Sequence, residues 1–212
     1  MHLKYLLPVL IISGLTACNK TDAPTATEQA SVAPKQMSTA TNTATPTPPK
    51  TRQYNAEVIN FEGFGPAKFG DNEESVRMSW GRPLVAGKPA KGATCYYLYK
   101  EAIPQQNNGI AFMLEDGKFV RYDVDDASIV APGGIVVGDT AAAVLAAHTD
   151  HVTKAPHKYI QGAQTLTVTP SHTTKSDQNE NARLIFEADS SGTIVHWRIG
   201  VAPQVYYVEG CS

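Results

Sequence analysis

The sequence predicts an α+β fold of two tandem repeats, each a short helix followed by an antiparallel hairpin. Residues 69–76 (FGDNEESV) recur about 68 positions later as residues 137–144 (VGDTAAAV), and strand-like segments follow each copy. We therefore expect one sheet with both helices packed on one face. Repeat one covers about 63–126 and repeat two about 133–211.

An aspartate precedes each predicted helix. Asp71, with Glu74 three residues later, forms a capping-box-like start, and Asp139 occupies the same place in the second copy. A carboxylate there accepts free backbone N–H groups and meets the positive end of the helix dipole. Gly81 and Pro83 are expected to end the first helix.

Each helix has two residues one turn apart that predict a buried face. They are Val76 and Trp80 in the first helix, and Val144 and His148 in the second. Both helices are expected to cover one face of the sheet, and Trp80 is expected to lie in the core.

Two hairpins follow from alternating apolar residues around turn residues. The first spans residues 110–124 around an Asp-Gly turn, and the second spans residues 184–199. Further short strands are expected at 94–99, 165–168 and 205–208.

The sheet face away from the helices is the expected binding surface. Tyrosine and arginine are enriched in protein interfaces, and several of both lie on predicted strands. We expect Tyr97, Tyr122 and Arg198 to face outward there. The alternative is that these residues belong to the core or to an ordinary surface. The loops at 104–108 and 171–181 are the next candidates.

Residues 1–17 predict a secretory signal peptide, with polar residues first and then an apolar stretch too short to cross a membrane. Residues 15–18 (LTAC) resemble the lipobox of bacterial lipoproteins, which implies cleavage before Cys18 and its acylation. Asn19 in place of aspartate implies the outer membrane. Residues 18–53, rich in Thr, Ala and Pro, predict a disordered tether, although such tracts also resemble O-glycosylated stalks.

The chain has three cysteines. If Cys18 carries lipid, Cys95 and Cys211 remain, and an oxidising compartment favours a disulfide between them. The alternative is two free buried thiols. The bridge would tie the end of the chain to its middle.

Residues 63–84 (GFGPAKFGDNEESVRMSWGRPL) resemble the repeated module of the BamE/SmpA/OmlA family of small bacterial outer-membrane lipoproteins. The tandem arrangement is similar to β-lactamase inhibitory protein. The second copy departs from the pattern, because Thr149 and Asp150 follow its helix where the module closes with Gly-x-Pro. The resemblance implies a binding or scaffolding role for the body at 54–212.

The sequence indicates no catalytic or metal chemistry. It has no Gly-x-Ser-x-Gly and no phosphate-binding loop, and His148, His151 and His157 lack the other ligands of a metal site. A net charge of -2 without a basic stripe argues against nucleic acid. We expect no cofactor, no catalytic residue and no metal.

The expected function is that of a non-catalytic module, anchored to the outer membrane by lipid, that binds or scaffolds an envelope protein. One alternative is inhibition of an exported hydrolase by a loop from the sheet. A glycan-binding or cell-wall-acting protein is a further alternative.

Overall fold

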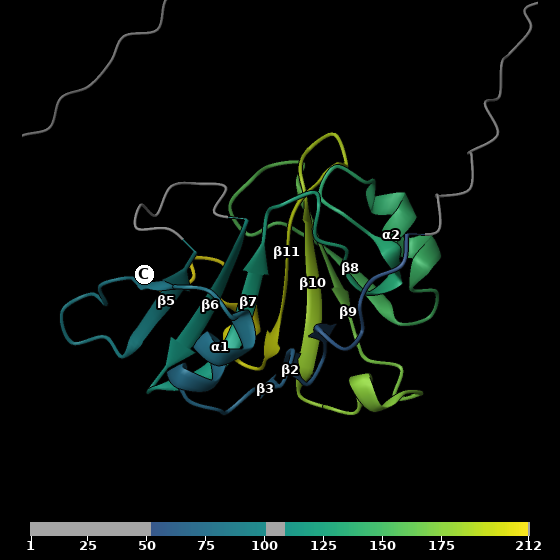
Figure 1. Ribbon diagram of the computed structural model, residues 1–212. Helices are drawn as coiled ribbons and strands as arrows, with labels where there is room; N and C mark the ends of the chain where they lie inside the picture. Colours follow the sequence, from purple (N-terminus) through teal and green to yellow (C-terminus); the bar gives the residue numbers. More distant parts are fainter. Residues whose placement is uncertain (1–51, 101–108, 212) are drawn as a thin grey trace, which may run out of the picture. The chain divides into compact units, whose positions relative to one another are not determined.

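The computed structural model describes residues 52–100 and 109–211, and these confirm the α+β class. An eight-stranded antiparallel sheet in the order β4-β5-β6-β7-β11-β10-β9-β8 carries two helices on one face, with a separate three-stranded sheet beside them (Figure 1). Each repeat contributes a four-stranded meander, and the meanders join where β7 pairs with β11. The predicted tandem arrangement is therefore present.

The first repeat begins with the small sheet and ends at β7. Its elements are β1 (Ile59–Asn60), β2 (Gly63–Phe64), β3 (Ala67–Lys68), α1 (Glu73–Trp80), β4 (Val85–Ala86), β5 (Cys95–Tyr99), β6 (Ile110–Glu115) and β7 (Lys118–Val124). The second repeat follows a 3-10 turn. Its elements are η1 (Pro132–Gly134), α2 (Ala141–Ala147), β8 (Val152–Pro156), β9 (Gln164–Val168), η2 (Lys175–Asp177), β10 (Ala182–Ala188), β11 (Ile194–Val201) and η3 (Gln204–Tyr206).

The repeated Gly-Asp pair builds the same tight turn in both repeats. Asp71 N donates to Lys68 O at 3.0 Å, and Lys68 N donates back to Asp71 Oδ2 at 2.8 Å. In the second copy, Asp139 N donates to Val136 O at 3.1 Å, and Val136 N donates to Asp139 Oδ2 at 2.9 Å. The glycines before the aspartates have φ 97° and 96°, a conformation that favours glycine.

These turns also attach each helix to the sheet. Asp71 O accepts from Phe119 N, and Gly70 N donates to Phe119 O, both at 2.8 Å. The second turn makes the same two bonds with Ile194, each 2.7 Å long. Phe119 and Ile194 therefore occupy equivalent places in the two hairpins.

The prediction that the aspartates cap the helices is wrong by one residue. Asn72 caps α1 by accepting from Ser75 N, and Thr140 caps α2 by accepting from Ala143 N. The carboxylates of Asp71 and Asp139 instead point back into the turns, because the glycine turn aims them at an earlier N–H group. Gly81, with φ 71°, ends α1 as expected.

Both hairpins contain a β-bulge at the same point. Met113 pairs with Arg121 and Leu114 with Phe119, so Val120 has no partner of its own on β6. In the second hairpin, Glu187 pairs with His196 and Ala188 with Ile194, so Val195 has no partner on β10. A bulge changes which residues share a face. As a result, Val120 and Arg121 both lie on the face away from the helices.

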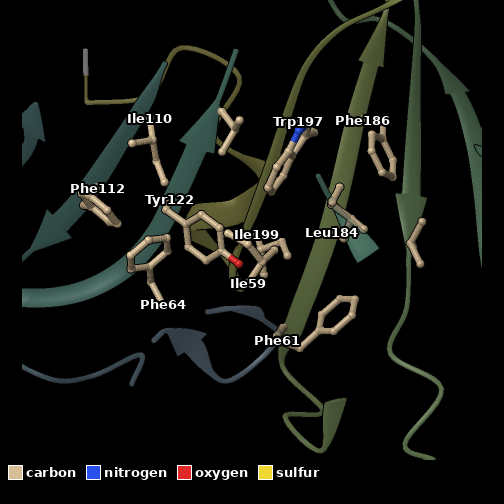
Figure 2. Close-up of a cluster of buried hydrophobic side chains, with 14 of the residues drawn as sticks. Ile59, Phe61, Phe64, Ile110, Phe112, Tyr122, Leu184, Phe186, Trp197 and Ile199 are labelled. Carbon is tan, nitrogen blue, oxygen red and sulfur yellow. The ribbon is translucent and has the colours of Figure 1, made fainter. Parts of the chain in front are cut away.

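Tyr122 lies in the core on the helix side, so its prediction as an outward-facing residue is wrong. Its ring is 5.7 Å from Phe64 and 6.2 Å from Trp197, and it is fully buried (Figure 2). Its hydroxyl donates to Asn60 O at 3.1 Å. Because Asp123, not Tyr122, pairs with Arg198, the two predicted residues face opposite ways.

The opposite face, here called the outer face, is partly covered by the C-terminal segment, residues 202–211. The predicted disulfide between Cys95 and Cys211 is present and closes a separation of 116 residues. The predicted strand at 205–208 is wrong, because the chain there forms the turn η3 and packs on β7, β10 and β11. In a strand, the backbone carbonyls of this segment would accept hydrogen bonds from a neighbouring strand. Here they accept hydrogen bonds from arginine side chains instead.

Candidate binding surfaces

The outer face carries a buried network of charged side chains. Arg121 and Asp123 form its centre: Arg121 Nε lies 2.8 Å from Asp123 Oδ2, and Arg121 Nη2 lies 2.7 Å from Asp123 Oδ1. Burial alone would raise the pKa of the Asp123 carboxyl, but the charge of Arg121, together with the hydrogen bond and charge of His196, holds that pKa well below its usual value. Asp123 is therefore an anion in the folded protein.

Arg121 also holds the C-terminal segment in place. Its Nη1 donates to Gln204 O at 3.0 Å and to Tyr207 O at 2.7 Å, and its Nη2 donates to Tyr97 Oη at 2.8 Å. Burial, followed by the charge of Asp123, raises the pKa of Tyr97, which remains a neutral phenol. Every donor group of Arg121 is used, so the network is a structural clamp.

Arg198 forms the second part of this clamp. It is 2 % exposed, its Nε donates to Val205 O at 2.7 Å, and its Nη1 contacts Glu187 Oε1. Burial would raise the pKa of Glu187, but the charge of Arg198 lowers it. Tyr97 and Arg198 do lie on the predicted face, yet both hold the C-terminal segment. Whether either contacts a partner stays a prediction.

The exposed aromatic surface includes part of that segment. The surface, here called the tyrosine shelf, consists of Tyr159, Ile160 and Tyr206, which are 53 %, 57 % and 48 % exposed. Tyr159 and Tyr206 line one cleft of about 550 Å³. The Tyr159 hydroxyl contacts Glu209 Oε1 in the C-terminal segment, and Lys158 Nζ lies 4.7 Å from the Tyr159 ring centroid.

A larger groove opens on the helix side of the sheet. This groove, here called the Trp80 groove, has a volume of about 830 Å³ and is lined by Tyr54, Val58, Ile59, Phe64, Trp80, Arg82 and Ile110, among others. Trp80 is only partly buried, so the expectation that it lies inside the core is corrected: it packs on the core and forms a groove wall.

Within residues 52–100 and 109–211, no group of three histidine, cysteine, aspartate or glutamate side chains is arranged to hold a metal ion. His148 contacts Phe186 on the helix side, whereas His157 faces Glu187 on the outer face, so the sheet separates them. In the same ranges, neither helix has the length and apolar character required to cross a bilayer. Cys18 lies outside the described residues.

Sequence reasoning missed Arg82, Tyr159 and Ile160 as surface features. Tyr159 and Ile160 follow two polar residues and precede Gly162, which indicates an exposed turn with two large apolar side chains. That signal was available in the sequence. Nothing in the sequence placed Arg82 over a groove, because the groove walls come from residues far apart in the chain.

No protein-family model matches the sequence, and a comparison with curated proteins finds no significant match. Among solved structures, the chain is distantly similar to the uncharacterized protein yfeY from Escherichia coli, with 15 % identity over 70 % of this chain and 99 % of that one, at a TM-score of 0.40. An extracellular protein containing a SCP domain from Bacillus anthracis shares 11 % identity over 72 % of this chain and 47 % of that one, at 0.41. A DUF4309 family protein, YjgB, from Bacillus subtilis shares 9 % sequence identity over 62 % of this chain and 78 % of that one, at a TM-score of 0.32. These similarities assign no family.

Proposed function

We propose that this chain is a non-catalytic protein-binding module of the bacterial cell envelope, held at the outer membrane by lipid on Cys18. The observation that carries the proposal is the tyrosine shelf, where Tyr206 stands exposed on the immobilised C-terminal segment and the exposed Tyr159 contacts that segment through Glu209. Exposed aromatic side chains that are already held in place bind at a low cost in conformational entropy.

Buried contacts hold the C-terminal segment, which carries Tyr206 of the shelf. Two buried arginines bind three carbonyls of the C-terminal segment, and the Cys95–Cys211 disulfide anchors its last residues. Loop entropy assigns roughly 4 to 5 kcal/mol to a disulfide that closes more than a hundred residues. The segment that presents Tyr206 is therefore ordered before any partner arrives.

The location rests on the N-terminal sequence and on the disulfide. A disulfide is typical of exported proteins, and the lipobox-like residues 15–18 supply the expected anchor. A tether of about 35 residues would give the body a typical reach near 30 Å from the bilayer. An envelope protein within that distance is the proposed partner.

The inhibitor alternative draws no support from the outer face. A loop that plugs a hydrolase from the sheet needs that face to be accessible, and the C-terminal segment covers Arg121 and Arg198 at its middle.

The test is capture of a partner from detergent-solubilised envelopes by the lipidated protein. Tyr206→Ser and Ile160→Ser should each reduce capture roughly tenfold or more, as expected when an interface anchor is truncated, and should leave the melting temperature unchanged. Met78→Ser is the matched control, because Met78 is 69 % exposed on α1 and lies outside the shelf.

Full capture by both shelf variants would refute the shelf as the binding site. Cys18→Ser should separately abolish palmitate labelling. Retained labelling in that variant would refute the anchor without bearing on the shelf.

A further inference from the structure

The Trp80 groove is a place where the hydrophobic core reaches solvent. Ile59, Phe64 and Ile110 are each at most 5 % exposed and belong to the main core, yet they also line the groove. Trp80 forms one wall, with its ring 5.9 Å from Phe64. An apolar floor of this kind favours a ligand that brings apolar surface of its own.

Among the described residues, the charged side chains that line the groove carry one net positive charge. They are Arg82, Lys100 and Asp126, two cations against one anion, although the whole chain has a net charge of -2. Hydrogen bonds from Ser128, and then the charge of Lys100, lower the pKa of Asp126, so its carboxylate already has partners. Among the described residues, neither Lys100 nor Arg82 forms an ion pair with a carboxylate, and Arg82 is the cation that lies over the Trp80 ring.

Arg82 is held at the groove by an aromatic ring. Its Cζ lies 4.9 Å from the centroid of the Trp80 ring, and among the described residues no carboxylate lies within 4 Å of its guanidinium. Stacking leaves the edge of a guanidinium free to donate two parallel hydrogen bonds, the arrangement that suits a carboxylate. The groove therefore combines an apolar floor with a free anion-binding group.

We infer that the Trp80 groove binds a single-chain anionic amphiphile of the fatty-acid type, with its carboxylate on Arg82 and its acyl chain along Val58, Ile59 and Phe64. The volume of about 830 Å³ lies within the range of small-ligand sites. The tether is a poor occupant, because residues 19–53 contain no Phe, Trp, Tyr, Ile or Leu to fill an apolar floor.

The point at which the tether joins the body favours the same ligand. Gln53, Tyr54 and Asn55 line the groove, so the tether from the proposed lipid on Cys18 ends at its wall. A membrane anchor would therefore hold the groove at a typical distance of about 30 Å from the bilayer, which is built of acyl chains. This ligand goes beyond the protein-binding function proposed above and uses a different surface.

The chain supplies its own reporter, because its two tryptophans differ in position. Trp80 lines the groove, whereas Trp197 is fully buried in the sheet. The experiment uses the full mature chain, produced without acyl chains on Cys18 and with its disulfide formed. Dibromostearate, a fatty acid that quenches tryptophan on contact, is added at submicellar concentration. Saturable quenching of Trp80 is the expected result.

Two variants identify the site. Trp80→Phe keeps an aromatic wall and should abolish quenching, because only Trp197 then reports. Arg82→Gln should weaken the affinity roughly tenfold, as loss of a charge-assisted bidentate pair predicts, and Arg82→Lys should restore part of it. Lys91→Gln, which removes an exposed positive charge away from the groove, should bind as the parent does.

The chemistry of the ligand is tested by changing it. Stearyl alcohol, which lacks the carboxylate, should compete at least tenfold more weakly than stearate. Each methylene removed from the acid should cost up to about fourfold in affinity, the value for full burial.

Undiminished quenching in Trp80→Phe would overturn the site, and equal affinity of Arg82→Gln would overturn the role of Arg82. Equal competition by the alcohol would overturn the anionic ligand. None of these results depends on the tyrosine shelf, so a failure here and a failure of the proposed function remain distinguishable.

Discussion

The two repeats share a scaffold, yet the cleft at the end of the second helix, about 260 Å³, is much smaller than the Trp80 groove, about 830 Å³. In both, a glycine–aspartate turn precedes the helix and bonds to the start of the last strand. The residue nine positions after the aspartate ends the helical region, and it is Trp80 in the first repeat and His148 in the second. Trp80 lies 5.8 Å from Phe112, and His148 lies 6.1 Å from Phe186, measured between ring centroids.

The difference lies in what covers that residue. His148 Nε2 is 3.0 Å from Pro132 O, and a Cβ on Gly133 would lie only 2.5 Å from the same nitrogen. The glycine thus lets the η1 turn close over the second helix. Trp80 instead packs on Phe64, and its other side is open to the groove and to Arg82. A change in one helix-terminal residue and its cover therefore accompanies the change from a small cleft to a large groove.

The largest expected effect is a loss of stability at the centre of the sheet. It tests whether the two repeats contribute equally to stability there. Tyr122 and Trp197 are both fully buried, on the two strands that join the meanders. Tyr122→Ala and Trp197→Ala should each lower the free energy of unfolding by roughly 3 to 5 kcal/mol. Urea denaturation measures this, with Val195→Ala as the control, since Val195 is 45 % exposed on β11. A loss below about 1 kcal/mol for Tyr122→Ala would contradict its core position.

An effect of intermediate size concerns the pH dependence of stability, which should differ between the two repeats. Burial lowers the pKa of His148 below its usual value, so the folded protein binds fewer protons there than the unfolded chain. The stability that neutral His148 contributes is thus present above about pH 6.5 and is lost as the pH falls through the folded-state pKa. In His148→Gln, the melting temperature should therefore depend less on pH below about pH 6.5 than it does in the parent.

Two variants serve as controls for that prediction. Trp80→Phe should leave the pH profile of the parent, because repeat one has no titrating side chain at this position. His172→Asn should do so as well: His172 is exposed with φ 58°, a conformation that asparagine tolerates. An unchanged profile in His148→Gln would show that the stability of the second repeat does not depend on a neutral histidine.

The smallest effect concerns the matched turns. Asp71→Ala and Asp139→Ala should each cost about 1 kcal/mol, because each leaves one backbone N–H without its acceptor. Asp139 also pairs with Arg52 at 2.6 Å, a surface ion pair worth at most about 1 kcal/mol more. Arg52→Gln isolates that increment in thermal unfolding. If Asp71→Ala had no effect while Asp139→Ala did, the two turns would not be energetically equivalent.

The sequence by itself determined the α+β class, the repeat, both hairpins and the Cys95–Cys211 pairing. These rest on local signals: glycine and aspartate at turns, alternation along strands, and the number of cysteines left once Cys18 is assigned to lipid. Each can be read within a few residues or from a simple count. The aspartate caps failed at this level because Asn72 and Thr140 were equally capable caps one position later.

Only the tertiary structure decided which side chains reach the surface. The face of a strand residue depends on register and bulges, and both are set by the partner strand, so Tyr122 was assigned to the wrong face. The C-terminal segment became a cover held by Arg121 and Arg198, because buried guanidinium groups must find acceptors wherever the fold supplies them. The Trp80 groove joins residues 53–59, the end of α1 and residues 126–130, which meet only in the folded protein.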